Sequence, residues 1–501
     1  MKFNLSDFSK QILCDGSVTD TVVETQQNGN ALSLYVTATQ DKVKFIELQW
    51  QFASDPDMYV LGDVWERSYG ELEFMKPENC NRWLPWYFIA TDKKECFCFG
   101  VQTQPNAFVS FRYTEKGITA LIDCRNGGNG VHLNGRKLHL ATFVYEEYAC
   151  DDVIACLHDY CKKLCPAPRL PKERIYGGNN WYYAYGKSSY DEILSDALFQ
   201  VALADGIENK PFQVIDDGWQ IHSCCGPWIA NEKFGDMKKL ADEMRAGGAR
   251  PGIWVRLLHT KDEKMTDEMR ILRNGERKYL DPTHPAVQQY IRDDIERIRA
   301  WGYEMLKHDF TTVDLFGHFG KDLNETITRF DDWHFYDKTL TNAEIVLALY
   351  RLIREAAGDM YIIGCNTVSH LCAGLVELNR IGDDTSGREW ARTRKMGVNT
   401  LAFRLAQNEA FYLCDADCVG ILDDCIPWTL NSQWLHLLSY SNTPLFVSCT
   451  DKVSAQQKKD LSEAYRVFQQ PHTICPIDIY ENKTPSRWQI DGQTVLYNWD
   501  E

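Results

Sequence analysis

The sequence lacks the features of secreted and membrane-bound proteins. Its N-terminus, Met1–Asp7, carries no basic region followed by an apolar run, and no stretch of about 20 apolar residues occurs anywhere. We therefore expect a cytoplasmic protein with no membrane partner, in which the 18 cysteines are reduced and mostly buried as small apolar side chains.

Positive charge is also scarce. The chain has 54 Lys and Arg against 71 Asp and Glu, which gives a net charge of −17 at pH 7. Such a balance argues against nucleic acids and anionic membrane surfaces as partners. The closely spaced cysteines, such as Cys96 and Cys98, lack a second Cys or His pair at zinc spacing, so we expect no metal.

Several catalytic motifs are missing as well. No serine elbow, phosphate loop or dinucleotide fingerprint occurs in a suitable context, and the glycine-rich run 127–130 has the composition of a turn. These absences disfavour serine hydrolases, phosphoryl transfer and nucleotide-dependent redox chemistry, and we expect no organic cofactor.

The hydrophobic pattern of the sequence changes along the chain. Residues 1–165 contain short alternating runs such as Leu32–Thr37 and Val43–Leu48, typical of an antiparallel β-sandwich, and end in a helical stretch, Asp151–Leu164. A proline-rich linker follows at 165–171. Residues 172–472 alternate short apolar strands with long amphipathic segments, and residues 473–501 read as a short β segment containing one hairpin.

Eight candidate strands occur in the central part, and they end in polar side chains. The strands are Tyr176–Tyr183, Phe212–Asp216, Arg250–Leu257, Tyr303–Asp309, Met360–Cys365, Leu378–Gly382, Phe411–Cys414 and Pro444–Ser448. Eight strand–helix units in about three hundred residues predict a (β/α)8 TIM barrel, with a doubly wound sheet as the alternative. We interpret 314–341 as an insertion after the fourth strand.

In a TIM barrel the carboxyl ends of the strands meet at the active site. The polar or aromatic residues expected there are Trp181, Asp216, Asp217, Trp254, Lys307, Asp309, Asn366, Arg380, Asp383 and Asp384. Carboxylates with aromatic rings are the equipment of glycoside hydrolysis, which needs one ionised carboxylate at the anomeric carbon and one protonated carboxyl at the leaving oxygen. Lys307 lies two residues before Asp309 on the strand, so both side chains point the same way and the ammonium favours an ionised Asp309.

At these residues the chain resembles clan D glycosidases, most closely glycoside hydrolase family 36, with family 27 behind it. The resemblance rests on Val214–Gln220 with its Asp-Asp-Gly-Trp core, Gly252–Trp254, Leu280–Pro285, Leu306–Phe310 with its Lys-x-Asp, and the spacing of Arg380 and Asp384. It covers nearly the whole chain and implies an N-terminal β-supersandwich, a catalytic barrel and a C-terminal β-domain, here cut short.

The resemblance also implies roles. Asp309 is the expected nucleophile, and Asp384 the general acid/base in preference to Asp383. Asp216 and Asp217 would bind two sugar hydroxyls, and Arg380 the sugar. Trp181 and Trp254 would wall the sugar, and Trp65 is either a tryptophan lent by the N-terminal domain or a core residue. Asn366 departs from the cysteine and glycine-rich run of many members, and we expect it near the 2-hydroxyl.

The predicted function is a retaining α-glycosidase, most simply an α-galactosidase acting on an oligosaccharide or glycoconjugate. An α-N-acetylgalactosaminidase or other α-glycosidase, such as one for an arabinopyranose, a raffinose-type transglycosylase and a non-catalytic carbohydrate-binding protein remain as alternatives. A metal-dependent hydrolase is disfavoured, because Asn179–Trp181 replaces the expected His-x-His. Family relatives are often oligomeric, so the resemblance adds a homo-oligomer to the expectations.

Overall fold

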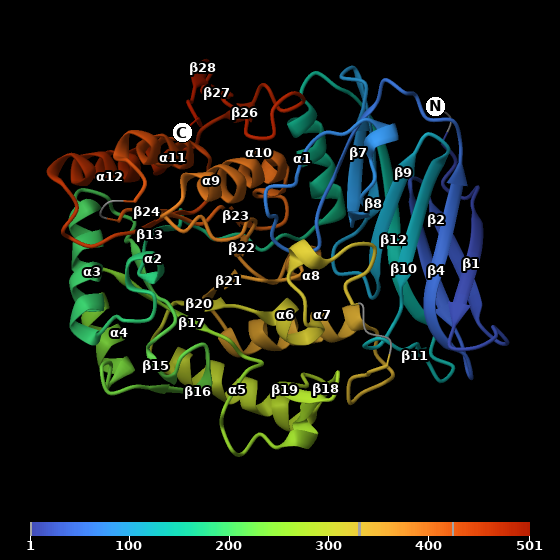
Figure 1. Cartoon of the computed structure of the whole chain (residues 1–501), viewed down its shortest axis with the longest axis horizontal. Coiled ribbons are helices and arrows are strands. Elements are labelled where there is room, and N and C mark those ends of the chain that lie inside the picture. The colour runs from blue at the N-terminus through green and yellow to red at the C-terminus, as the bar shows by residue number, and fades with distance from the viewer. Residues whose placement is uncertain (1–2, 329–331, 423–424, 501) are drawn as a thin grey trace.

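The computed structural model describes residues 3–328, 332–422 and 425–500 (Figure 1). Its N-terminal part holds two six-stranded antiparallel sheets. One has the order β1-β4-β10-β9-β6, with β11 beside β4, and the other β2-β3-β12-β8-β7-β5. The strands are β1 (Ser9–Cys14), β2 (Val22–Asn28), β3 (Ala31–Thr37), β4 (Lys42–Gln51), β5 (Tyr59–Gly62), β6 (Leu84–Pro85), β7 (Tyr87–Thr91), β8 (Glu95–Val101), β9 (Phe108–Thr114), β10 (Gly117–Asp123), β11 (Val131–His132) and β12 (Leu138–Ala149).

The alternating sequence runs form these strands as predicted. In β3, every second side chain is buried, including Leu32, Leu34 and Val36, because successive side chains of a strand point to opposite faces. Helix α1 (Val153–Leu164) follows the second sheet and begins where the Asp152 carboxylate accepts hydrogen bonds from the backbone N–H groups of Ile154 and Ala155.

The central part is a curled, wholly parallel sheet of nine strands in the order β23-β22-β21-β20-β17-β14-β13-β25-β24. The strands are β13 (Tyr176–Asn179), β14 (Phe212–Ile215), β17 (Arg250–Val255), β20 (Met305–His308), β21 (Tyr361–Gly364), β22 (Leu378–Arg380), β23 (Leu413–Asp415), β24 (Cys418–Gly420) and β25 (Leu445–Ser448). The order follows the chain, whereas a doubly wound sheet reverses it part-way, which argues against that alternative.

The two ends of this sheet are joined by only two residues. β23 pairs with β22, and β24 with β25, yet Ala416 and Asp417 alone separate β23 from β24. Asp417 takes a left-handed conformation with φ of +73°, which breaks the strand between its two partners. The sheet therefore curls until its edges meet at this point. β24 is a strand that the sequence patterns did not predict.

Helices cover the outside of the curled sheet in Figure 1. They are α3 (Tyr190–Leu203), α4 (Met237–Ala246), α5 (Pro285–Ala300), α7 (Asn342–Ala357), α11 (Trp428–Tyr440) and α12 (Ala455–Phe468). Shorter helical pieces are α2 (Trp181–Ala184), α6 (Thr311–Phe316), α8 (Ser369–Cys372), α9 (Trp390–Arg392) and α10 (Thr400–Arg404), with single-turn or π-type segments η1 (Pro77–Asn79), η2 (Asp267–Met269), η3 (Gly320–Asp322), η4 (Thr393–Asn399) and η5 (Leu405–Gln407). The start of α7 shows why these segments become helices: Thr341 and Glu344 form a reciprocal capping box.

Two sequence expectations about element bounds were wrong. The first barrel strand ends at Asn179 rather than Tyr183, because the Asn179 side-chain oxygen accepts a hydrogen bond from the backbone N–H of Trp181 at 2.9 Å and turns the chain into α2. The single helix expected over Trp390–Asn408 is instead divided into α9, the π-type segment η4, α10 and η5.

Two β-hairpins project from the loops, β15 (Gln220–His222) with β16 (Cys225–Ala230) and β18 (Arg270–Arg273) with β19 (Glu276–Leu280). Of the insertion expected over 314–341, the first residues complete α6, and residues 329–331 lie outside the described part of the chain.

The expected C-terminal hairpin is β27 (Arg487–Ile490) with β28 (Gln493–Leu496), and β26 (Ile474–Pro476) adds a third strand. It is anchored by Trp488, which is fully buried, and by Trp499, whose ring lies 5.9 Å from that of Trp390. Among the described residues, no helix combines the length and apolar character that a membrane span requires.

Candidate active site

The candidate site lies at the carboxyl ends of the parallel strands, where the sequence analysis placed it. Its side chains come from the carboxyl ends of β13, β14, β17, β20, β21 and β22, from the residues that follow these strands, and from a loop of the N-terminal part. That loop reaches the sheet through Ser68, which forms a parallel bridge with Gly382 through backbone hydrogen bonds of 2.8 and 3.0 Å. Two structural layers therefore contribute to one cluster.

Asp309 directly follows β20 and is 9% exposed. One carboxylate oxygen accepts hydrogen bonds from the Asn366 side-chain amide and the Phe310 backbone N–H, both at 2.7 Å, and the other from the Trp254 indole N–H at 3.1 Å. Burial raises the pKa of Asp309, but Arg67, Lys307 and these hydrogen bonds outweigh it and hold the pKa below its ordinary value. Asp309 is therefore an ionised carboxylate in a fixed orientation.

The backbone on either side of this contact is unusual. Phe310 and Asn366 both take left-handed conformations, with φ of +63° and +54°. Non-glycine residues rarely adopt this region, so the surrounding structure must hold them there. The Asn366 carbonyl is bonded by the hydroxyls of Thr311 and Thr312 at 3.0 and 2.8 Å. These bonds fix the Asn366 amide on Asp309, while its side-chain oxygen is buried without a partner among the described residues.

Lys307 contacts Asp216. Its ammonium lies 2.7 Å from one Asp216 oxygen, which also accepts a hydrogen bond from the Asn179 amide at 2.9 Å. The Lys307 ammonium thus links the ends of β14 and β20. It acts on Asp309 through its charge, because no hydrogen bond joins these two described side chains. Asp217, next in the chain, is held by the backbone N–H of Cys224 at 2.8 Å.

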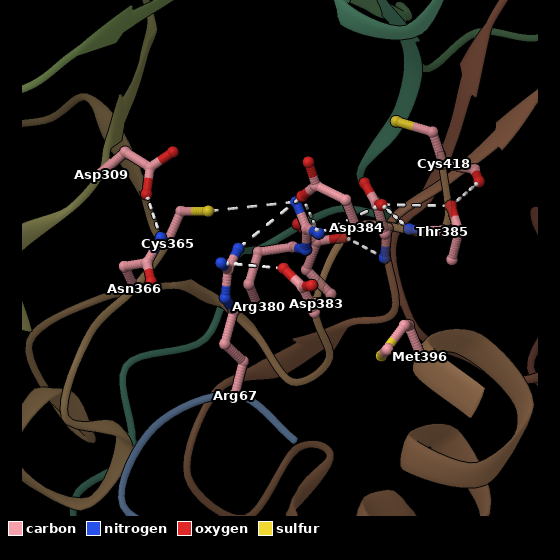
Figure 2. A network of polar contacts seen from close by, with 12 residues as sticks. Arg67, Asp309, Cys365, Asn366, Arg380, Asp383, Asp384, Thr385, Met396 and Cys418 are labelled. Carbon is pink, nitrogen blue, oxygen red and sulfur yellow. Dashed lines mark hydrogen bonds and ion pairs between the residues drawn. The ribbon is translucent and has the colours of Figure 1, made fainter. Parts of the chain in front are cut away.

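Asp384 lies beside two guanidinium groups, those of Arg380 and Arg67 (Figure 2). Arg380 approaches one of its carboxylate oxygens at 3.0 Å and Arg67 approaches the same oxygen at 3.7 Å. Burial raises the pKa of Asp384, but Arg380, Arg67 and Lys307 together lower it to about 2. The side chain is 36% exposed, which makes it the more accessible of the two expected catalytic carboxylates.

Asp383, the neighbour of Asp384, has a different task. Its two oxygens form ion pairs with Arg67 at 2.8 Å and with Arg392 at 2.7 Å. Asp383 does not cap the following helix, because α9 begins after Glu389; it positions Arg67 instead.

Arg380 is itself fixed from behind. It lies 3.1 Å from Asp417, the left-handed residue between β23 and β24. The same Asp417 oxygen accepts hydrogen bonds from the Thr385 backbone N–H at 2.8 Å and from the Tyr182 hydroxyl. The break between β23 and β24 therefore places the buried Asp417 carboxylate where it orients Arg380, the arginine that contacts Asp384.

The three expected tryptophans lie in different surroundings. Trp254 is 2% exposed and meets Asp309 through its N–H. Trp181 is partly buried in the turn after β13, with its ring 5.0 Å from Tyr185. Trp65 is 3% exposed, with its ring 4.9 Å from Trp86 and 5.6 Å from Phe108, and its N–H bonds the Asn324 carbonyl at 2.7 Å. These are the contacts of a core residue.

Arg67 is the residue that the sequence analysis missed. The sequence analysis considered Trp65 as a residue lent by the N-terminal domain, but not the arginine two positions later. Only the ion pairs with Asp383 and Asp384, more than 300 residues away, reveal its place.

Comparisons with known proteins show what this arrangement resembles. Neither protein-family models nor curated proteins give a match. Among solved structures, an α-galactosidase from Thermus thermophilus, in complex with p-nitrophenyl α-D-galactopyranoside, aligns over 98% of this chain and 99% of its own, with a TM-score of 0.64 and 16% identity. A family 36 α-galactosidase from Geobacillus stearothermophilus, in complex with stachyose, aligns over 97% of this chain and 78% of its own, with a TM-score of 0.62 and 14% identity.

The chain has the fold of the family 36 α-galactosidases. A family 31 sulfoquinovosidase from E. rectale also aligns, over 99% of this chain and 86% of its own, with a TM-score of 0.56 and 12% identity. This chain is thus similar in fold to glycosidases of different named activities, and identities this low carry the fold alone. The activity must be argued from the side chains of the site.

Proposed function

We propose that this protein is a retaining α-glycosidase, with terminal α-linked galactose as its substrate. The observation that carries the proposal is Asp309: an ionised, nearly buried carboxylate held by three hydrogen bonds at the end of a parallel strand, in a fold shared with α-galactosidases. Asp384, partly exposed and contacted by Arg380, supplies the second carboxyl group.

The proposed reaction is a double displacement. Asp309 attacks the anomeric carbon while Asp384 protonates the leaving oxygen, so a covalent glycosyl-enzyme forms and the aglycone departs. Asp384 then takes a proton from water, which attacks the same carbon and releases the sugar with its configuration retained. This course predicts that the two carboxyl groups lie about 5–6 Å apart.

The low pKa of Asp384 bears on the first step. In the substrate-free protein two guanidinium groups favour its ionised form, whereas a general acid must carry a proton. Since about a third of the side chain is exposed, an aglycone that covers it removes water and raises its pKa toward the working range. Substrate binding is therefore proposed to complete the acid.

The remaining side chains are proposed to hold the sugar. Asp216 and Asp217 would accept charge-assisted hydrogen bonds from two hydroxyls, and Asn366, which contacts Asp309, would lie near the 2-hydroxyl. Trp181 and Trp254 are proposed to wall the ring. No metal or organic cofactor takes part in this chemistry.

The scaffold proposal follows the sequence analysis. The curled sheet would be the (β/α)8 barrel, with β23 and β24 as halves of its seventh strand. Residues 1–165, 172–472 and 473–501 would form the N-terminal sandwich, the catalytic domain and a short C-terminal β segment. A homo-oligomer stays a prediction. The non-catalytic carbohydrate-binding alternative is disfavoured, because both expected carboxylates are present.

A panel of 4-nitrophenyl α- and β-glycosides tests the proposal. Purified protein should cleave the α-galactoside, and NMR should show the α-anomer of galactose forming first. Cleavage of the α-N-acetylgalactosaminide instead would show that the released sugar is N-acetylgalactosamine rather than galactose. First appearance of the β-anomer, or no cleavage of any member, would contradict the proposed activity.

A further inference from the structure

A second cluster of reactive side chains lies in the N-terminal part and involves none of the carboxylate-site residues. The sulfur atoms of Cys96, Cys150 and Cys156 all lie within 4.8 Å of one another. Cys96 and Cys150 are 2% and 5% exposed, and Cys156 is partly buried. The sequence spacing of the cysteines did not predict this group, because its members are 54 and 6 residues apart.

The fold brings the three cysteines together from β8, from the residue after β12 and from α1. Cys96 belongs to β8 and pairs with Tyr148 of β12, so Cys150 lies just beyond the end of the same ladder. The backbone N–H of Cys150 bonds the Lys94 carbonyl at 2.6 Å, which holds it beside β8. Cys156 lies in the first turns of α1, where its backbone N–H bonds the Asp152 carbonyl at 3.0 Å.

From this geometry we propose that Cys96, Cys150 and Cys156 bind one thiophilic d10 cation, zinc or monovalent copper. Thiolate sulfurs are the ligands that select these ions. A zinc–sulfur bond of about 2.3 Å places tetrahedral ligands about 3.8 Å apart, so the three sulfurs need to close by about 1 Å at most. Small changes of side-chain rotamer provide such a movement.

The burial of the cluster is compatible with a bound cation, because a metal ion displaces the thiol protons and offsets the cost of burying thiolate charge. Cys156 also lies near the N-terminus of a 12-residue helix, whose dipole stabilises a thiolate.

The fourth ligand separates the two ions. Among the described residues, no further His, Cys, Asp or Glu ligand atom joins the group. Zinc would therefore take a water on the partly exposed side of Cys156, whereas monovalent copper is satisfied by three sulfurs. X-ray absorption at the bound metal distinguishes three sulfurs plus one oxygen from three sulfurs alone.

Metal retention tests the proposal. Metal-free, reduced protein is loaded anaerobically with Zn²⁺ or with Cu⁺, passed over a desalting column in the presence of a weak chelator, and its metal measured. We expect one more equivalent per chain in the wild type than in Cys156→Ser, and a higher unfolding temperature only when the site is intact. Cys475→Ser is the matched control, because this partly buried thiol lies 3.7 Å from Asp152 but outside the group. It should retain metal like the wild type.

Two results would overturn the proposal. One is equal metal retention by the wild type and Cys156→Ser for both ions. The other is a disulfide between two of the three cysteines in protein purified without reductant, together with no metal uptake after reduction. The disulfide is detected as the loss of two hydrogens in the intact mass and is abolished by Cys96→Ser or by Cys156→Ser. Because Cys156 is not fully buried, its serine variant should fold, and circular dichroism of all variants checks this.

Discussion

At the scale of single residues, the site is governed by where its cations lie. Lys307 and Arg67 lower the pKa of Asp309, and Arg380, Arg67 and Lys307 lower that of Asp384. Arg67 is thus a positioning residue that acts on both expected catalytic carboxylates from outside the parallel sheet.

This shared influence gives a pH prediction. Arg67→Gln should raise the pKa of both Asp309 and Asp384. The acidic limb of the kcat/KM profile, which reports ionisation of the nucleophile in the free enzyme, should move to higher pH. So should the basic limb of the kcat profile, which reports loss of the acid's proton in the substrate complex. Each limb should shift by roughly one pH unit, as expected when a nearby opposite charge is removed.

The control for this measurement is Arg392→Gln. Arg392 binds the Asp383 carboxylate at 2.7 Å and the Asp384 carbonyl at 2.9 Å, so its loss perturbs the same loop without removing a main influence on the Asp384 carboxylate. Equal profiles for wild type and Arg67→Gln would sink the role assigned to Arg67.

The expected site residues could be named from the sequence because they follow strands, and strand ends meet at one edge of a parallel sheet. Asp309, Trp254 and Asn366 do come together. Arg67 could not be found that way, because its position depends on how Ser68 of an N-terminal loop bonds the backbone of Ile381 and Asp383. The hydrogen bond from the Trp254 N–H to Asp309 could not be predicted either, since the direction of a side chain is a property of the folded site.

At the scale of elements, the loop after β5 meets η3 through a buried carboxyl group. Glu66 is fully buried, and it accepts a hydrogen bond from the Gly320 backbone N–H at 2.5 Å. Burial raises the pKa of Glu66 from 4.5 to about 7, against the opposing effects of Arg67 and Gly320. The folded state therefore holds a proton that the unfolded chain releases between these two pH values.

Stability should respond accordingly. Because the folded state binds more protons here, the contribution of Glu66 to the free energy of unfolding falls as pH rises from about 4.5 to 7. Glu66→Gln should remove this loss. Its gain in the free energy of unfolding over the wild type should therefore be larger at pH 8 than at pH 5, by up to roughly 3 kcal/mol. Urea denaturation at the two pH values measures the difference. Glu78→Gln, at an exposed position, should show none, and a Glu66→Gln effect of equal size at both pH values would contradict the explanation.

Element types were predictable from periodicity, but some bounds were not. β13 ends early because of one side-chain hydrogen bond at Asn179, and the strand after η5 is broken by the left-handed Asp417. Neither event changes the apolar pattern on which the strand predictions rested. The division of Trp390–Asn408 into several helical types likewise left the hydrophobic spacing intact.

At the scale of the whole molecule, a buried ion pair joins the N-terminal part to the helical segment after β22. Arg404 contacts Asp63 at 2.8 Å, and their side chains are 1% and 2% exposed. Asp63 also accepts a hydrogen bond from Gln407 at 2.9 Å. Sequence patterns could not predict this contact, because its partners are 341 positions apart.

Asp63→Ala should be strongly destabilising, since it leaves a buried guanidinium without its partner. We expect a loss of about 3–5 kcal/mol, measured by urea denaturation. Asp242→Ala removes an exposed pair with Lys238 and should leave the denaturation midpoint nearly unchanged. Similar midpoints for both variants would show that the contact does not hold the two parts together.

The central claim is that Asp309 attacks the sugar, and one comparison tests it most directly. Wild type and Asp309→Asn are assayed on 4-nitrophenyl α-galactoside, with Asp196→Asn, a buried aspartate on α3, as the matched control. The account predicts that Asp309→Asn loses activity by about 1,000-fold or more, roughly 4 kcal/mol of transition-state stabilisation, while keeping its fold, and that Asp196→Asn stays active. Full activity in folded Asp309→Asn would contradict the assignment.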